Sequence, residues 1–172
     1  RLGRRDDAVD PLERSIALLD PADPVARDDF FDAQSALGRI MFRRFDYARA
    51  RAHFRAALAH ALSPERMGDP ERMGIEYWLS SASFFGEQAE GLVAIDDAIA
   101  RASNAPDRDR DRIALYTTVK ARILLNQGNY QEAYTLLRSA VSNQGGLDRR
   151  VTMSEVETRN DAALAAALVG DQ

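Results

Sequence analysis

One six-residue phrase recurs along the chain at a nearly constant interval. Its copies begin at Phe45, Gly86 and Gly128, and a fainter copy begins at Gly3. The copies end at positions 8, 50, 91 and 133, so the intervals are 42, 41 and 42 residues. A fixed period of this size is typical of stacked supersecondary units, each of which needs its neighbours to bury its apolar face. The period therefore predicts a repeat array, which does not close around a single core.

Between the copies of the phrase, apolar residues recur at steps of three and four, as they do on one face of an α-helix. Leu37, Ile40 and Met41 follow this spacing before the second copy, and Phe54 and Leu58 follow it afterwards. No window alternates apolar and polar residues as a half-buried strand does. The pattern predicts an all-α chain of about eight helices, at about 5–20, 26–44, 46–62, 70–85, 87–103, 109–127, 129–143 and 153–169.

Helix-breaking residues divide the predicted helices into pairs, and the turn within each pair is short. A short connection makes the two helices of a pair antiparallel neighbours. We therefore expect a single array over residues 1–172, made of a half repeat at 1–20, repeats at about 26–62, 70–103 and 109–143, and a half repeat at 153–172. Pro11 lies inside the first predicted helix and should kink it or delay its start to about Asp10.

The residues around the phrase resemble the tetratricopeptide repeat. In the second helix pair the matching residues are Leu37, Gly38, Tyr47, Ala50, Phe54 and Ala57, and in the fourth they are Gly128, Tyr130, Ala133, Leu137 and Ala140. The third pair is similar at Trp78, Leu79, Gly86, Gly91, Ile95 and Ala98. Small residues recur at positions 38, 121 and 163, with Leu79 as the large exception. The resemblance implies a right-handed α-solenoid, similar to the longer-helix variants in kinesin light chains and some bacterial regulators.

Composition and motifs argue against several classes of function. The formal net charge is −4, so no electrostatic footprint supports nucleic-acid binding. There is no cysteine, no phosphate-binding glycine loop, no Gly-flanked nucleophilic Ser and no paired histidine motif with a helical Glu. His53 and His60 share a helix face without an evident third metal ligand. We expect no enzyme activity, no cofactor, no metal site and no membrane span, since no apolar run approaches about 20 residues.

The origin of the chain is only partly indicated. Arginine greatly outnumbers lysine, which occurs only at Lys120, and we interpret this as codon bias in a GC-rich, bacterial genome. The chain begins with Arg1 at what the repeat places as a helix–helix turn, so we expect a fragment or a processed form. No targeting segment is visible, which leaves the cytoplasm and the periplasm or envelope as alternatives.

The resemblance implies a protein–protein interaction module, because in this family the first helix of each pair lines a concave groove that receives a peptide or a partner helix. Arginines in such a groove would bind a carboxylate by fork-shaped hydrogen bonds, and aromatic rings would anchor apolar side chains. Solvated arginines and rings packed inside the array are the alternatives. Helical phase predicts these groove residues: Arg39, Phe42, Arg43, Glu76, Tyr77, Ser80, Phe84, Thr118, Arg122, Asn126, Asn160 and Asp161.

A second hypothesis is a structural or dimerisation arm, or a regulatory sensor domain, of a larger protein. The terminal half repeats leave apolar faces without a covering helix, and exposed patches of that kind favour self-association through the terminal helices. The residues on these faces are Leu12, Ile16, Leu19, Leu164 and Leu168.

Overall fold

The computed structural model describes residues 8–60, 70–105, 110–143 and 153–170. Within these ranges the chain is all α-helical and has no strand, as predicted. Every predicted helix bound except the first lies within three residues of the observed one. The eight helices are α2 (Val9–Leu18), α3 (Arg27–Arg43), α4 (Tyr47–Ala59), α5 (Pro70–Ser83), α6 (Gln88–Asn104), α7 (Arg110–Asn126), α8 (Tyr130–Asn143) and α9 (Met153–Val169).

The start of α2 reflects the position of its proline. The helix begins at Val9, so Pro11 lies in its first turn. The backbone N–H groups of a first turn have no partner inside the helix, so the missing N–H of proline costs little there. The predicted delay of this helix is therefore confirmed.

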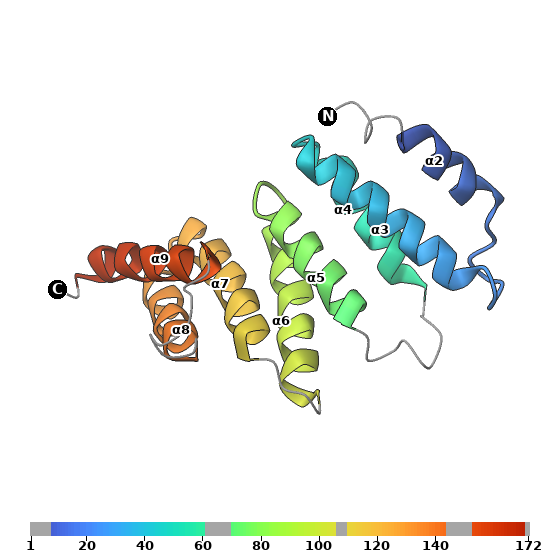
Figure 1. Ribbon diagram of the computed structural model, residues 1–172. Coiled ribbons are helices and arrows are strands. Elements are labelled where there is room, and N and C mark those ends of the chain that lie inside the picture. The colour runs from blue at the N-terminus through green and yellow to red at the C-terminus, as the bar shows by residue number, and fades with distance from the viewer. Residues whose placement is uncertain (1–7, 61–69, 106–109, 144–152, 171–172) are drawn as a thin grey trace.

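The helices are laid out in succession along the array. Each helix packs against the next one in the chain, and the first helices of the pairs, α3, α5, α7 and α9, also contact one another. Figure 1 shows α2 at one end of the molecule and α9 at the other, with the remaining helices between them in chain order. The first helices therefore form one continuous layer.

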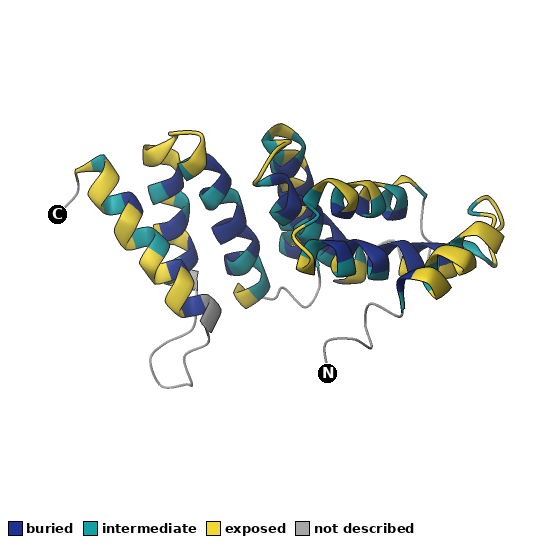
Figure 2. Ribbon diagram, turned by 90° about the horizontal axis from the view of Figure 1, so that it is seen from above, coloured by how far each residue is buried: buried dark blue, intermediate teal, exposed yellow. Residues whose placement is uncertain are grey.

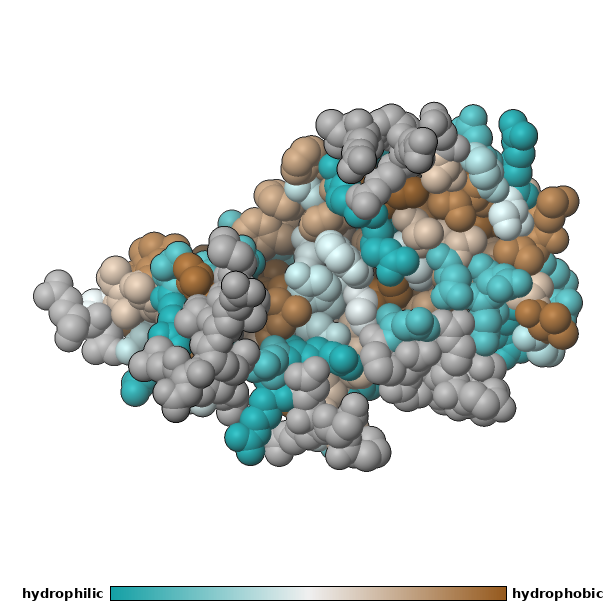
Figure 3. All heavy atoms as spheres, viewed as in Figure 1, coloured by the Kyte–Doolittle hydropathy of each residue, from teal (hydrophilic) through white to brown (hydrophobic). Residues whose placement is uncertain are grey.

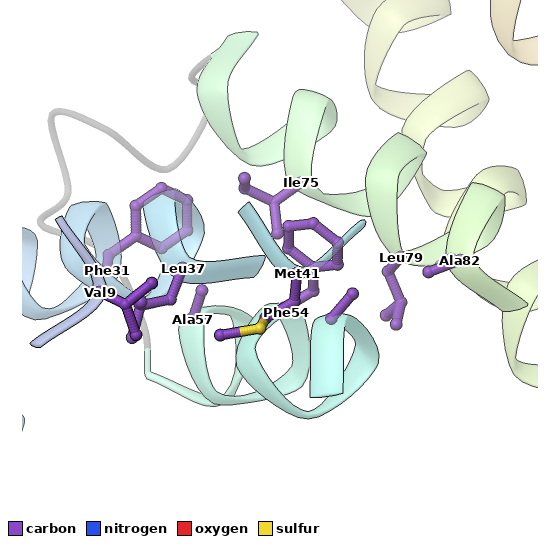
Figure 4. Close-up of a cluster of buried hydrophobic side chains, with 11 residues drawn as sticks. Val9, Phe31, Leu37, Met41, Phe54, Ala57, Ile75, Leu79 and Ala82 are labelled. Atoms are coloured by element: carbon purple, nitrogen blue, oxygen red, sulfur yellow. The ribbon is translucent and has the colours of Figure 1, made fainter. Parts of the chain in front are cut away.

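The apolar core is divided along the array in the same way. In the described residues, three clusters of buried side chains follow one another, and each joins consecutive helices. The first cluster draws on α2, α3, α4, α5 and α6 (Figure 4), the second on α5, α6 and α7, and the third on α7, α8 and α9. Buried residues accordingly form stripes between neighbouring helices (Figure 2).

Small residues allow the two helices of a pair to approach closely. A Cβ placed on Gly38 in α3 would lie 2.4 Å from Cε1 of Phe54 in α4, and the Phe54 side chain is fully buried. In the next pair, a Cβ on Gly91 would lie 2.8 Å from Cβ of Ser83. Both contacts are shorter than van der Waals packing permits, so each position accommodates only glycine without displacement of its neighbours.

The contacts of α5 show which of its small residues lie against α6. The period makes position 79 the counterpart of Gly38, facing the second helix of its pair. In the structure, Leu79 packs in the first cluster, and Ser83 and the backbone carbonyl of Ser80 lie against Gly91 in α6. Ser80 and Ser83 are thus small residues of α5 that lie against α6, and Leu79 stays a large residue at the position equivalent to Gly38.

The turn that follows α5 is closed differently from the other two turns within pairs. The α3–α4 and α7–α8 turns are closed by equivalent hydrogen bonds, from Asp46 N to Met41 O and from Asn129 N to Leu124 O. The corresponding carbonyl in α5, that of Ala82, accepts instead from Nη1 of Arg51. The α5–α6 turn also leaves one more residue outside the helices than the other two turns do. The α5–α6 turn therefore differs in length and in hydrogen bonding from the other two turns within pairs.

Candidate functional site

Aromatic rings from three consecutive helix pairs form a continuous series of contacts across the array, which we call the aromatic strip. The rings come from α3, α4, α5, α7 and the turns that follow α3 and α5. Successive rings lie 4.5–6.3 Å apart between centroids, within the range for favourable aromatic pairs. Its members are Phe42, Phe45, Tyr47, Tyr77, Trp78, Phe84, Phe85 and Tyr116.

The strip is buried at one end and open at the other. Tyr116 in α7 is only 4 % exposed, whereas Phe45 is 78 % exposed and Phe85 is 62 % exposed. Tyr47 lies between these two rings: it stacks on Phe85 with a centroid distance of 4.5 Å and meets Phe45 edge-on at 6.3 Å. We call Phe45, Tyr47 and Phe85 the turn platform, because it lies where the α3–α4 and α5–α6 turns meet.

Phe45 has an unusual backbone conformation. Its φ angle is +63°, in the left-handed region, and it is the only non-glycine residue with a positive φ in the described part of the chain. In the α7–α8 turn the equivalent position is Gly128, with a φ of +82°. Glycine adopts this conformation without steric cost, but a bulky side chain does not.

Two exposed arginines flank the strip on α3. Arg39 lies three residues before Phe42 and four before Arg43, so it neighbours both of them on the helix surface. Nε of Arg43 donates to the carbonyl of Arg39 at 3.3 Å. Within the described residues, neither guanidinium group has an acidic partner. Both were predicted as groove residues, and both are open to solvent.

The third predicted arginine is engaged inside the array. Nε of Arg122 in α7 lies 2.6 Å from Oδ2 of Asp161 in α9, and its Nη2 lies 3.1 Å from Oε2 of Glu157. Burial lowers the pKa of Arg122, but the bonds to Asp161 and Glu157 outweigh this effect, and the net pKa is raised. An acidic ligand would therefore compete with two carboxylates of the chain for this guanidinium.

The same two helices are joined by a buried pair of hydroxyl groups. Oγ1 of Thr118 lies 3.0 Å from Oγ1 of Thr158 and donates to the carbonyl of Ala114 at 2.8 Å. Thr118 is 2 % exposed, so its side chain is used in packing between α7 and α9. Of the other groove residues predicted for these helices, Asn126 and Asn160 are exposed.

Two predicted groove residues of α5 are also buried. Oε1 of Glu76 lies 3.3 Å from Nε of Arg72 and 3.2 Å from Nε of Arg101, while its Oε2 has no hydrogen-bond partner among the described residues. Burial raises the pKa of Glu76, and the two arginines oppose this rise. Ser80 is fully buried. Both residues lie on the side of α5 that faces α6, since Arg101 and Gly91 belong to α6.

The other two residues predicted here, Tyr77 in α5 and Phe84 in the turn that follows it, lie in the strip. Tyr77 and Phe84 are half-buried, and burial raises the pKa of the Tyr77 hydroxyl. Sequence reasoning missed the most exposed part of the strip, Phe45 and Phe85, together with Tyr47 and Trp78. The sequence held a signal at two places. At position 45 a phenylalanine replaces the glycine that opens the other copies of the phrase, and at positions 84 and 85 two phenylalanines come directly before the copy that begins at Gly86.

The two histidines contact other side chains of the array. Both are half-buried; His53 Nδ1 lies 2.8 Å from Oε1 of Gln34, and the His60 ring packs edge-on against Phe30 at 5.3 Å. Burial lowers the pKa of His53, with Arg49 adding to the effect. Across the described ranges, no group of His, Asp and Glu side chains is placed to hold a metal ion. No helix there is long and apolar enough to cross a membrane.

Comparison with known proteins gave no relative: no family model, no curated protein and no solved structure matches the chain. The features of the chain that bear on its function are therefore the chemistry of the strip and of the arginines on α3.

Proposed function

We propose that this chain is a protein-interaction module with the architecture of a tetratricopeptide-repeat-like, right-handed α-solenoid. In this proposal, the layer of first helices binds an extended peptide or a helix of a partner protein. The interval of about 42 residues, the succession of helix pairs and the contacts among α3, α5, α7 and α9 support the architecture. The observation that carries the binding function is the aromatic strip, which ends in exposed rings, together with two arginines on α3 that have no acidic partner in the described part of the chain.

A ligand that covers this surface would bury exposed rings and would bind charged hydrogen-bond donors. Phe45 and Phe85 expose most of their rings to water, and aromatic side chains contribute more buried area per residue than other side chains do. Arg39 and Arg43 each offer a planar set of donors that fits a carboxylate. Aromatic residues and arginines are also the residue types that contribute most of the binding energy in protein interfaces. The surface thus combines apolar anchors with directional, charged contacts.

A direct test is selection of peptides from a random display library on the immobilised chain, followed by titration of the selected peptides in solution. We expect saturable binding that the double variant Arg39→Glu/Arg43→Glu weakens strongly. The control variant Arg14→Glu/Arg159→Glu changes the net charge by the same amount at two exposed arginines on α2 and α9, and should bind as the wild type does. The absence of any saturable peptide, or equal weakening by both variants, would refute the proposal.

A second candidate function, assembly into a larger structure, is favoured by α9. Val156, Leu164 and Leu168 on this helix are 40 %, 54 % and 45 % exposed, and Figure 3 shows hydrophobic side chains at the surface over it. Leu168 also lines an open hollow of about 520 Å³ between the end of α9 and the start of α8. Light scattering after size-exclusion chromatography distinguishes the two functions. A dimer that Leu164→Ser/Leu168→Ser converts to a monomer would favour assembly.

A further inference from the structure

We infer that the partner segment is acidic and carries at least one aromatic or large aliphatic side chain, which packs on the turn platform of Phe45, Tyr47 and Phe85. The carboxylates of the segment bind Arg39 and Arg43. This inference rests on the proposed function and narrows it to one end of the strip and one class of partner. Three independent observations support it: the geometry of the rings, the backbone of Phe45 and the distribution of charge.

The rings of the turn platform are supported from behind and open in front. Phe85 is stacked on Tyr47 and also meets Phe84 edge-on at a centroid distance of 4.9 Å. Tyr47 in turn contacts Phe42 at 5.3 Å. Rings held in this way lose little conformational entropy when a ligand covers them, so most of the gain from burying their exposed faces is available for binding.

The backbone of Phe45 points to a role outside folding. A left-handed φ costs a bulky residue of order 1 kcal/mol or more, and Gly128 meets the same requirement in the α7–α8 turn without that cost. Because Phe45 is 78 % exposed, its ring repays little of this strain through packing within the chain. Strained backbone of this kind is concentrated at functional sites. Covering the ring with a ligand supplies a reason for a phenylalanine at this position.

The charges around the platform are arranged so that the positive ones remain available. The chain as a whole is acidic, with a net charge of −4. The acidic residues that begin α6 are already bound: Glu87 by Arg51 and Arg55, and Glu90 by Arg55. Asp46, between Phe45 and Tyr47, accepts from the backbone N–H of Arg49 as the N-cap of α4.

Arg39 and Arg43, on the helix that ends just before Phe45, lack an acidic partner among the described residues. A segment with carboxylates spaced around an apolar side chain complements this arrangement. A basic segment is repelled by it.

Three synthetic peptides of equal length test the inference by fluorescence anisotropy with the full chain. The first alternates acidic residues with phenylalanine, the second replaces each phenylalanine by alanine, and the third replaces each acidic residue by lysine. We expect the first peptide to bind at least about ten-fold more tightly than either of the others, with an affinity that falls as salt is added.

Variants assign the binding to the platform. Arg39→Glu/Arg43→Glu and Phe45→Gly/Phe85→Ser should each weaken the first peptide by at least about ten-fold. Phe45→Gly relieves backbone strain, so this variant remains folded, which circular dichroism verifies. Val93→Ser, at an exposed apolar residue on α6, is the matched control and should leave the affinity unchanged.

Other results would overturn the inference. Equal binding of the lysine peptide excludes an acidic partner, and undiminished binding to Phe45→Gly/Phe85→Ser excludes the platform. If display selection yields saturable peptides that lack acidic and aromatic residues, the proposed function stands and this inference fails. If selection yields none, both fail. Self-association that Phe45→Gly/Phe85→Ser abolishes would identify a second copy of the chain as the occupant instead.

Discussion

Replacement of Gly38 by alanine tests the packing of the first complete helix pair. The added Cβ would lie 2.4 Å from Cε1, 2.5 Å from Cδ1 and 2.9 Å from Cζ of Phe54. Ordinary contact begins at about 3.4 Å, so the ring must move by roughly 1 Å in a close-packed core. The Phe54 ring is fully buried among side chains of the first cluster, including Leu37 and Met41, which leave it no free space.

Two opposing effects set the size of the change. Overpacking of this kind costs about 1–3 kcal/mol, whereas glycine to alanine inside a helix gains about 1 kcal/mol from helix propensity. We therefore expect Gly38→Ala to lower the free energy of unfolding by up to about 2 kcal/mol. Gly74→Ala in α5 is the matched control, because nothing lies within 4 Å of a Cβ at that position. It should gain about 1 kcal/mol.

Urea unfolding followed by circular dichroism measures both changes, and comparison of the slopes shows whether the transitions are equally cooperative. A third variant identifies the cause. Phe54→Leu removes Cε1 and Cζ, so Gly38→Ala should cost less in that background, with a coupling of about 1 kcal/mol or more. If Gly38→Ala stabilises the chain as much as Gly74→Ala does, the Phe54 ring does not fill this space and the described packing is refuted.

Three further predictions follow from single residues. Phe45→Gly should raise the free energy of unfolding by about 1 kcal/mol, measured in urea, because it relieves the strained φ and removes an exposed ring; a loss of stability would contradict the strain. Thr158→Val should cost about 1 kcal/mol and speed hydrogen exchange in α9, since it breaks the buried bond to Thr118; unchanged exchange would show that this bond does not hold α9. Burial raises the pKa of Glu76 above its ordinary 4.5, so the folded chain binds this proton more tightly than the unfolded chain does. The contribution of Glu76 to stability is thus present below pH 4.5 and lost as pH rises towards neutrality, and Glu76→Gln should remove that decline. The free energies of unfolding of the wild type and of Glu76→Gln are measured in urea across this pH range. If both change in parallel, the decline does not come from Glu76.

The helices and their order were predictable from the sequence because both depend on local patterns. The steps of three and four between apolar residues marked each helix, and the phrase at 45, 86 and 128 marked each turn within a pair. The bond from Arg51 to the carbonyl of Ala82 was not predictable, because it joins two different helix pairs. The sequence period alone predicts the same geometry for all three turns within pairs.

In the candidate site, too, features that depend on local sequence were predictable, and contacts between distant parts of the chain were not. Helical phase was sufficient to identify Arg39, Phe42 and Arg43, since Arg39 neighbours both of the others on the surface of α3. It did not reveal that Arg122 is bound by Asp161, since this contact joins two helices that are almost forty residues apart in the chain. The turn platform was missed for a related reason. Phe45 and Phe85 belong to turns of different repeats, and only the stacking of the pairs brings both rings to Tyr47.

Small-angle X-ray scattering of the monomer tests the central claim, that helix pairs are laid out in succession and do not surround a common centre. A compact domain of 172 residues has a radius of gyration of about 16 Å. We expect a larger value and an asymmetric pair-distance distribution with a long tail, because α2 and α9 lie at opposite ends of the molecule. A radius of about 16 Å with a symmetric distribution would contradict the successive arrangement and, with it, the continuous face proposed for binding.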